Sequence, residues 1–212
     1  MQKLIIILSV LLLGLFCPAK GQTNYETQMK LALEEFSEAQ QFEQLDSVAM
    51  HFDEIAVKHP DNWLPLYYSM LSKTLQAFEM NKKQAIEVSN EMEKDYDLLL
   101  TLDPDMSEAL TLRGFFRTIK LDKDPQTYGM VLPSAIIYDY NEAILLNPEN
   151  PRALYMLAYF NIRSAPFYGK DPKQYCPMLN EAKQLYSKES KVLEPTWGEE
   201  HLDEIIKTEC TE

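Results

Sequence analysis

Apolar residues recur along this chain at the spacing of a helix. Three pairs of residues four apart share a composition, an aliphatic or methionine side chain followed by an aromatic one: Val48 and Phe52, Met92 and Tyr96, Ile136 and Tyr140. A helix makes one turn in about 3.6 residues, so both members of each pair lie on one helical face. Ala182 and Tyr186 form a fourth pair. The pattern predicts helices with a buried stripe, and no strand pattern of useful length accompanies them.

Prolines follow these pairs at a nearly constant interval. Each lies eight residues after the aromatic residue, or nine in the last case: Pro60, Pro104, Pro148 and Pro195. The intervals are 44, 44 and 47 residues. Proline ends a helix, and leucines recur at the same offset in the segments that follow, at Leu66, Leu110 and Leu154. A fixed period of this size indicates an array of helical repeats, each with two helices, a loop and a turn.

Three of these features together resemble the tetratricopeptide repeat (TPR) family. They are the apolar–aromatic pair of the second helix, the closing proline, and a small residue in the first helix at Gly114 and Ala158. The resemblance implies an all-α fold, a right-handed α-α superhelix of about four helix pairs with a C-terminal capping helix. The chain departs from the family in its period, since the usual unit has about 34 residues. Val48 and Met70 also stand where small residues are expected.

The repeats predict one domain over residues 22–212, because solenoid units bury their faces only against neighbouring units. We expect units at about 25–60, 61–104, 105–148 and 149–195, and a cap at 197–210. The cap has Leu202, Ile205 and Ile206 on one side and acidic residues on the other. A terminal helix with a solvated outer face should have this composition.

The N-terminus has the composition of a secretory signal. Lys3 precedes a mostly apolar run over residues 4–16, which is shorter than the roughly 20 residues of a membrane span. Small residues at Ala19 and Gly21 predict cleavage before Gln22, so residues 1–21 are the expected signal peptide. The alternative, a lipoprotein signal using Cys17, is disfavoured by the bulky Phe16 before it. We expect an exported, periplasmic protein with no stable membrane span.

Export determines how the cysteines are interpreted. Cys176 and Cys210 remain after removal of the signal, an even number in an oxidising compartment. Cys176 precedes a helix-starting proline and Cys210 ends the last expected helix, so antiparallel neighbours could bring them together. We expect a disulfide; the alternative is two unrelated buried thiols.

Acidic residues outnumber basic ones by 33 to 20, giving a formal net charge of −13. Nucleic-acid binding requires Lys and Arg to neutralise phosphates, so this class of partner is excluded. An acidic surface could attract a basic protein or peptide, or could serve solubility alone.

Two loops carry an aromatic–glycine step, Tyr128-Gly129 and Tyr168-Gly169, close to one repeat apart. Equivalent loops of a solenoid line up along one edge, where Met130 and Phe167 would join the two tyrosines in a partner-binding patch. Tyr67, beside the buried stripe of another unit, is a further candidate. The alternative is that the loops fold back and fill gaps between units.

A narrower resemblance adds to this picture. The motifs Phe167-Tyr168-Gly169 and Pro195-Thr196-Trp197-Gly198, with Cys176 and Cys210, resemble small exported TPR proteins of Bacteroidetes-type bacteria. That resemblance implies export, an all-helical array and paired cysteines. It implies no particular activity.

No catalytic motif is present. The sequence has no His-Glu-x-x-His zinc motif, no Gly-rich phosphate loop and no Gly-x-Ser-x-Gly. We expect no catalysis, no cofactor and no metal. The predicted function is a scaffold that binds a protein or peptide in its concave groove or along the loop edge. A structural component of an envelope complex is the alternative, self-association stays open, and an enzyme is the remote third reading.

Overall fold

The computed structural model describes residues 20–39, 41–189 and 193–211, and all of the regular structure in these ranges is helical. The predictions that concern residues 1–19, including the signal run and Cys17, lie outside the described residues. The described residues form ten α-helices and two short 3₁₀ helices: α1 Lys20–Glu38, α2 Phe42–Lys58, α3 Trp63–Ala77, α4 Lys82–Leu100, α5 Met106–Lys123, α6 Pro125–Tyr128, α7 Leu132–Leu146, α8 Pro151–Ser164, η1 Ala165–Tyr168, η2 Pro172–Tyr175, α9 Cys176–Tyr186 and α10 Glu199–Cys210. The all-α prediction is confirmed. Within these ranges no helix is both long and apolar enough to span a membrane.

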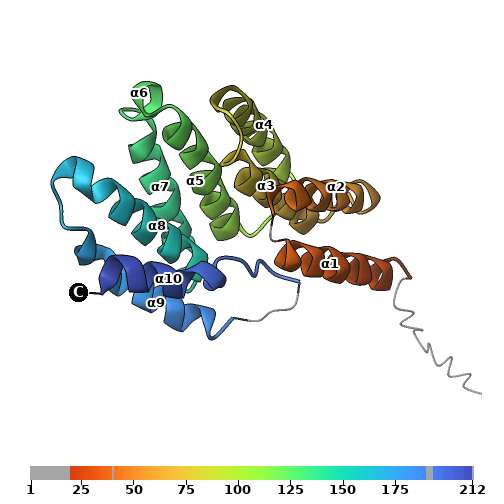
Figure 1. Ribbon diagram of the computed structural model, residues 1–212. Coiled ribbons are helices and arrows are strands. Elements are labelled where there is room, and N and C mark those ends of the chain that lie inside the picture. The colour runs from red at the N-terminus through yellow and green to blue at the C-terminus, as the bar shows by residue number, and fades with distance from the viewer. Residues whose placement is uncertain (1–19, 40, 190–192, 212) are drawn as a thin grey trace, which may run out of the picture.

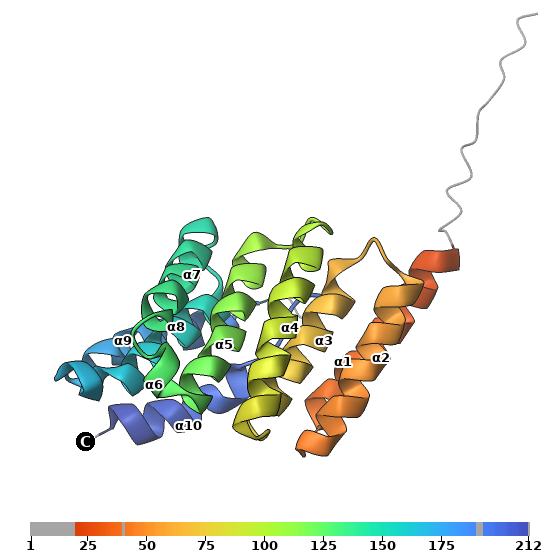
Figure 2. The ribbon, with the colours of Figure 1, turned by 90° about the horizontal axis from the view of Figure 1, so that it is seen from above.

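The helices are arranged as a row. Except where short α6 intervenes, each long helix packs on the next one along the chain, and α5 also packs on α3 and on α8. Figure 2 shows the row from above, and Figure 1 shows that the row is curved. Because each helix contacts mainly its neighbours in sequence, local patterns along the chain determine most of the packing.

The predicted apolar stripe is buried throughout. All eight residues of the four pairs are nearly inaccessible to solvent: Val48, Phe52, Met92, Tyr96, Ile136, Tyr140, Ala182 and Tyr186. The small residue predicted at Gly114 has a clear packing reason. A Cβ atom there would lie 2.5 Å from the Tyr140 ring, so only glycine lets α5 approach α7 this closely.

Polar residues after two of the prolines begin the next helices. Asp105 accepts hydrogen bonds from the backbone N–H groups of Ser107 and Glu108 at the start of α5. Asn150 does the same for the first turn of α8 and donates to the Ser107 hydroxyl at 2.9 Å. Such caps satisfy amides that have no partner inside the helix. The turns of two successive units are therefore bonded to each other.

The last segment of the chain departs from a simple end cap. Residues 193–198 run back to α3, where the Thr196 amide donates to the Tyr68 hydroxyl at 2.8 Å. The Trp197 indole N–H donates to the Tyr67 hydroxyl at 2.7 Å, across 130 positions of sequence. Helix α10 then packs on α9. The segment before α10 therefore connects the last helices of the row back to α3, a contact that an end cap alone does not predict.

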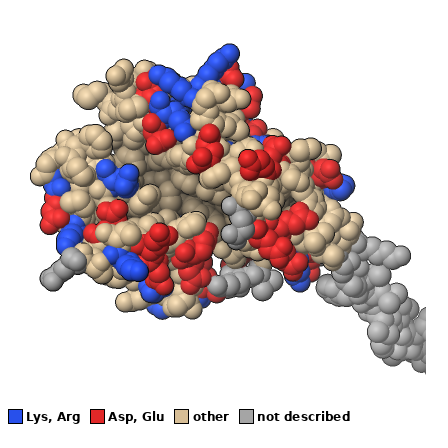
Figure 3. All heavy atoms as spheres, viewed as in Figure 1, with Lys and Arg blue, Asp and Glu red and all other residues tan. Residues whose placement is uncertain are grey.

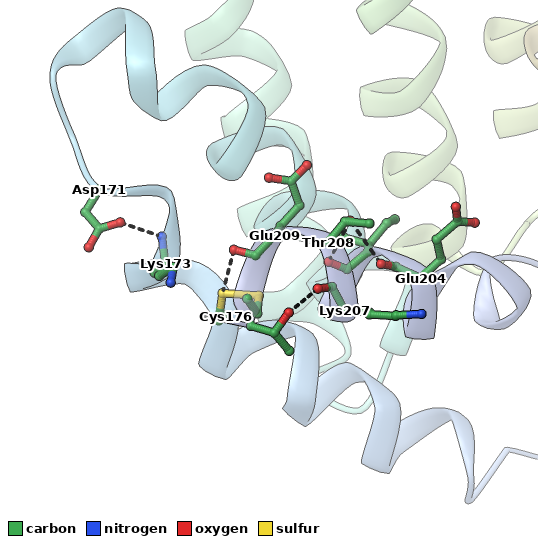
Figure 4. Close-up of a disulfide and its surroundings, with 10 residues drawn as sticks. Asp171, Lys173, Cys176, Glu204, Lys207, Thr208 and Glu209 are labelled. Carbon is green, nitrogen blue, oxygen red and sulfur yellow. Dashed lines mark hydrogen bonds between the residues drawn. A yellow bond between two sulfur atoms is a disulfide. The ribbon is translucent and has the colours of Figure 1, made fainter.

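A disulfide joins Cys176, at the start of α9, to Cys210, at the end of α10, as the cysteine count predicted. The two Cα atoms are 5.8 Å apart (Figure 4). Helix α10 is thus fastened at its first turn by the segment at Trp197 and at its last turn by a covalent bond.

Candidate functional site

A pocket of about 460 Å³ opens on the inner side of the row, between α10 and four other helices. Figure 3 shows the molecule hollowed at its centre, with uncharged walls and acidic residues along part of the edge. One wall is apolar or aromatic and is built from α1, α3, α5 and α8: Phe36, Leu75, Phe115, Tyr155, Met156 and Tyr159. The same hollow is bordered by Trp197, Gly198 and Ile205. Its volume and lining are those of a small-molecule site.

Flat side chains give this wall its shape. The Trp197 ring stacks on Phe115 with centroids 5.7 Å apart and planes 15° from parallel. On α8, Tyr155 and Tyr159 stack with an interplanar angle of 23°. Aromatic faces of this kind favour a flat, apolar partner that can stack in turn.

The opposite side of the pocket is polar and comes from α10 alone: Glu200, His201, Glu204, Thr208 and Glu209. Glu200 accepts a hydrogen bond from the Gly198 amide at 2.9 Å. Glu209 lies 4.0 Å from Arg163, which is itself largely exposed. The pocket lining has three carboxylates and no Lys or Arg.

Behind Trp197, a buried polar network holds the wall in place. The Tyr67 hydroxyl, which accepts from Trp197, donates to Glu108 at 2.9 Å. Glu108 accepts from Arg152 at 2.9 Å, and Arg152 also bonds Glu189 at 3.0 Å. Burial raises the pKa of Glu108, against the opposing charge of Arg152, and burial with the neighbouring Glu108 raises that of Tyr67.

This network has the buried, perturbed groups that an enzyme could use, but it does not line the pocket. Glu108 and Arg152 are 5% and 3% exposed, and each is paired. Perturbed pKa values also arise in structural ion-pair networks. We assign the network to support of Trp197. Within the described residues, no cluster of His, Cys, Asp and Glu suits a metal ion.

The residues predicted for partner binding differ in how far they are exposed to solvent. Met130 and Phe167 are 95% and 88% exposed, Tyr168 is exposed, and Tyr128 is half-buried. Figure 1 shows α6 and η1, which carry these loops, standing apart. Tyr67 is fully buried, and a partner cannot reach it, because the segment at Trp197 covers its hydroxyl.

Sequence reasoning did not identify the pocket. Its lining comes from five helices, and Phe36, Phe115 and Tyr159 have the same pattern in sequence as core residues. One signal was present: Tyr155 and Tyr159 form an aromatic i, i+4 pair in the first helix of a unit, outside the repeating stripe.

Comparison with known proteins gives one informative result. No family model matches the chain, so membership of the TPR family is not shown. No curated protein matches it either. Among solved structures, it is similar to the HusA haemophore from Porphyromonas gingivalis, with a TM-score of 0.75 and 21% sequence identity. The alignment covers 89% of this chain and 92% of the haemophore. At this identity the likeness shows a shared all-helical fold.

Proposed function

We propose that this protein is a non-catalytic binding protein that holds a flat, largely apolar ligand of the porphyrin class, haem included, in the pocket beside α10. The observation that carries the proposal is the wall of stacked aromatic residues around a hollow of about 460 Å³. Pockets of roughly 300–1,000 Å³ are typical of small-molecule sites. The name of the structurally similar haemophore supports the same ligand class.

The residues of the apolar wall suit a porphyrin ring. Phe115 and Tyr159 offer partly exposed rings, the buried Trp197 borders the pocket behind them, and Leu75 and Met156 complete the apolar lining. Burial of apolar area and ring stacking would supply the affinity. His201 and Met156 carry side chains of the kinds that ligate haem iron in proteins.

The expected place of action belongs to the same proposal. The apolar run at residues 4–16 supports export, and the bond between Cys176 and Cys210 suits an oxidising compartment such as the periplasm. An exported binding protein could meet its ligand outside the cytoplasm. Anchoring through Cys17 is the alternative within this proposal.

A matched pair of tyrosine variants tests the ligand. Tyr159→Ala removes a ring from the pocket wall, whereas Tyr138→Ala removes a 59% exposed ring on α7 that does not line it. We expect Tyr159→Ala to weaken porphyrin binding about tenfold, from the loss of roughly 1.4 kcal/mol of stacking and burial. Titration with a porphyrin, followed by Soret absorbance and tryptophan quenching, measures this. Absence of porphyrin binding by the wild-type chain, or equal effects of the two variants, would contradict the proposal.

A protein or peptide partner at the loop edge is the second candidate. It rests on the exposure of Met130, Phe167 and Tyr168, with the half-buried Tyr128 near Met130 in sequence, because exposed aromatic and methionine residues are enriched where partners bind. The right-handed superhelix predicted from the TPR resemblance would align the two loops along one edge. The test is capture of partners from envelope extracts by the wild type and by a Met130→Ser/Phe167→Ser variant. Equal recovery of the same partners would contradict it.

The alternative, a structural component of an envelope complex, is supported by a different set of exposed residues. Large apolar side chains are also exposed on α2, α4 and α7: Met50, Val57, Leu98, Tyr138 and Leu145. These would be the contact residues of an envelope complex or of a homo-oligomer. Sedimentation of the purified protein over a range of concentrations tests self-association.

A further inference from the structure

The charges of the pocket are all on one side. Every ionisable carboxylate that lines it comes from α10, at Glu200, Glu204 and Glu209, and the facing wall from α1, α3, α5 and α8 has none. On the same helix, His201 Nε2 lies 3.9 Å from a carboxylate oxygen of Glu200, and no Lys or Arg lines the pocket. A ligand in the pocket therefore has a neutral aromatic surface on one side and a row of acids on the other.

The three carboxylates differ in how far they are neutralised. Glu200 accepts the Gly198 amide, and Glu209 has a distant partner in Arg163. Within the described residues, the Glu204 carboxylate takes part in no hydrogen bond or ion pair, and it is exposed at the pocket. Glu204 is thus the group most available to a bound molecule, and its charge is the least compensated.

We infer that the pocket selects its ligand by charge. It accepts a flat ring whose edge facing α10 is uncharged or cationic, and it disfavours carboxylates at that edge. The inference rests on the proposed function, because it specifies the ligand class of the same site. A porphyrin with two carboxylates on one edge would bind with that edge turned away from α10, since two like charges repel even across solvent.

A series of porphyrins with one ring and different side groups tests the inference. The probes are protoporphyrin IX as its dicarboxylate, its dimethyl ester, and its bis(aminoethyl) amide, at the same low content of co-solvent. The wild type should bind the cationic amide about threefold to fivefold more tightly than the dicarboxylate, the range expected of one charge pair at short distance in water. Raising the salt concentration should reduce this difference, because salt screens exposed charges.

Glu204→Gln removes the uncompensated charge without changing the size of the side chain. It should cut the preference for the cationic probe about threefold. The matched control is Glu87→Gln, an exposed carboxylate on α4, which contributes nothing to the pocket. This variant should bind all three probes as the wild type does.

The outcomes separate the two proposals. Binding of all three probes with equal affinity, or a preference that Glu204→Gln leaves unchanged, overturns the charge selection while the porphyrin site stands. Failure of all three probes to bind overturns the proposed function, and the charge selection with it. A thermal melt of each variant in the absence of ligand confirms that the compared proteins are folded.

Discussion

Two fully buried tyrosines hold their surroundings together in different ways. Tyr140, between α5 and α7, fits against Gly114, and within the described residues its hydroxyl has no hydrogen-bond partner. Tyr67, on α3, is bonded on both sides of its hydroxyl, to Glu108 and to Trp197. The Tyr140 ring itself acts by close packing between α5 and α7, beside the ion pairs of buried Asp139 with Arg113 and Arg117. Where the last segment returns to α3, the Tyr67 hydroxyl acts through directional hydrogen bonds to Glu108 and Trp197.

The difference follows from what each region has to specify. Neighbouring helices of the row combine complementary apolar surfaces, which act without direction, with ion pairs such as that of Arg113 and Asp139. The returning segment must place one indole ring at one spot in the pocket wall. Hydrogen bonds have the directionality for that, and buried polar networks can fix a single arrangement.

The largest effect is expected from Arg152→Met. This change leaves Glu108 and Glu189 without their buried partner, and breaking a buried pair from one side lowers the free energy of unfolding by about 3–5 kcal/mol. Arg163→Met, at a largely exposed arginine, is the control and should change it by less than about 1 kcal/mol. Urea unfolding followed by circular dichroism measures both. Similar values for the two variants would contradict the assigned role of the network.

Removal of the disulfide should come next. The bond between Cys176 and Cys210 spans 34 positions, and the chain-entropy relation gives a loss of about 3–4 kcal/mol for Cys176→Ser/Cys210→Ser. Because the bond fastens one end of α10, the pocket should loosen, and porphyrin affinity should fall further than after Gly114→Ala, which acts at the contact of α5 with α7. Thermal melts and titrations on the double variant and on Gly114→Ala make that comparison. Equal losses of affinity in the two would argue against a role of α10 in the site.

Gly114→Ala is expected to lower the free energy of unfolding less, through the contact of α5 with α7 alone. The new Cβ would meet the Tyr140 ring at 2.5 Å, so α5 and α7 must move apart. Overpacking of this kind costs about 1–3 kcal/mol. Ala158→Gly, at the matching position of α8, removes a methyl and serves as the opposite change. Gly114→Ala with wild-type stability would show that the contact has room to relax.

The smallest changes in the free energy of unfolding are expected from removing the two tyrosine hydroxyls, and these two variants compare the two regions most directly. Tyr67→Phe leaves the Trp197 indole N–H without its acceptor and should lower the free energy of unfolding by about 1–2 kcal/mol. Tyr140→Phe removes an unbonded hydroxyl and should change it by less than about 0.5 kcal/mol, or raise it. Near-ultraviolet circular dichroism should report a change around Trp197 only in the first variant. Equal effects would remove the distinction between the two regions.

The sequence predicts well what neighbouring residues determine. The pairs such as Ile136 and Tyr140 were predicted to be buried, and they are, because an i, i+4 spacing is a property of one helix. Cys176 and Cys210 could be paired because few cysteines were available. The small residue at Gly114 was expected where two helices approach closely, and the Tyr140 ring lies there.

The pocket depends on contacts that have no local signature. Trp197 and Tyr67 are 130 positions apart, and nothing in the spacing of either residue indicates the other. Tyr67 was therefore predicted to bind a partner, but it is fully buried and the segment at Trp197 covers its hydroxyl. The lining residue Phe115 and the core residue Phe116 are adjacent in sequence, and only the placement of α10 makes one of them a wall of the site.

The pocket takes Phe36 from the first described helix and Trp197 and Ile205 from the last residues of the chain. Phe36 and Trp197 lie more than 150 residues apart, so the site of a nascent chain stays incomplete until α10 has been made. Under the proposals of export and of porphyrin binding, the chain would cross the membrane without its ligand and bind it afterwards. Premature termination before α10 would remove the polar side of the pocket and the cysteine that pairs with Cys176.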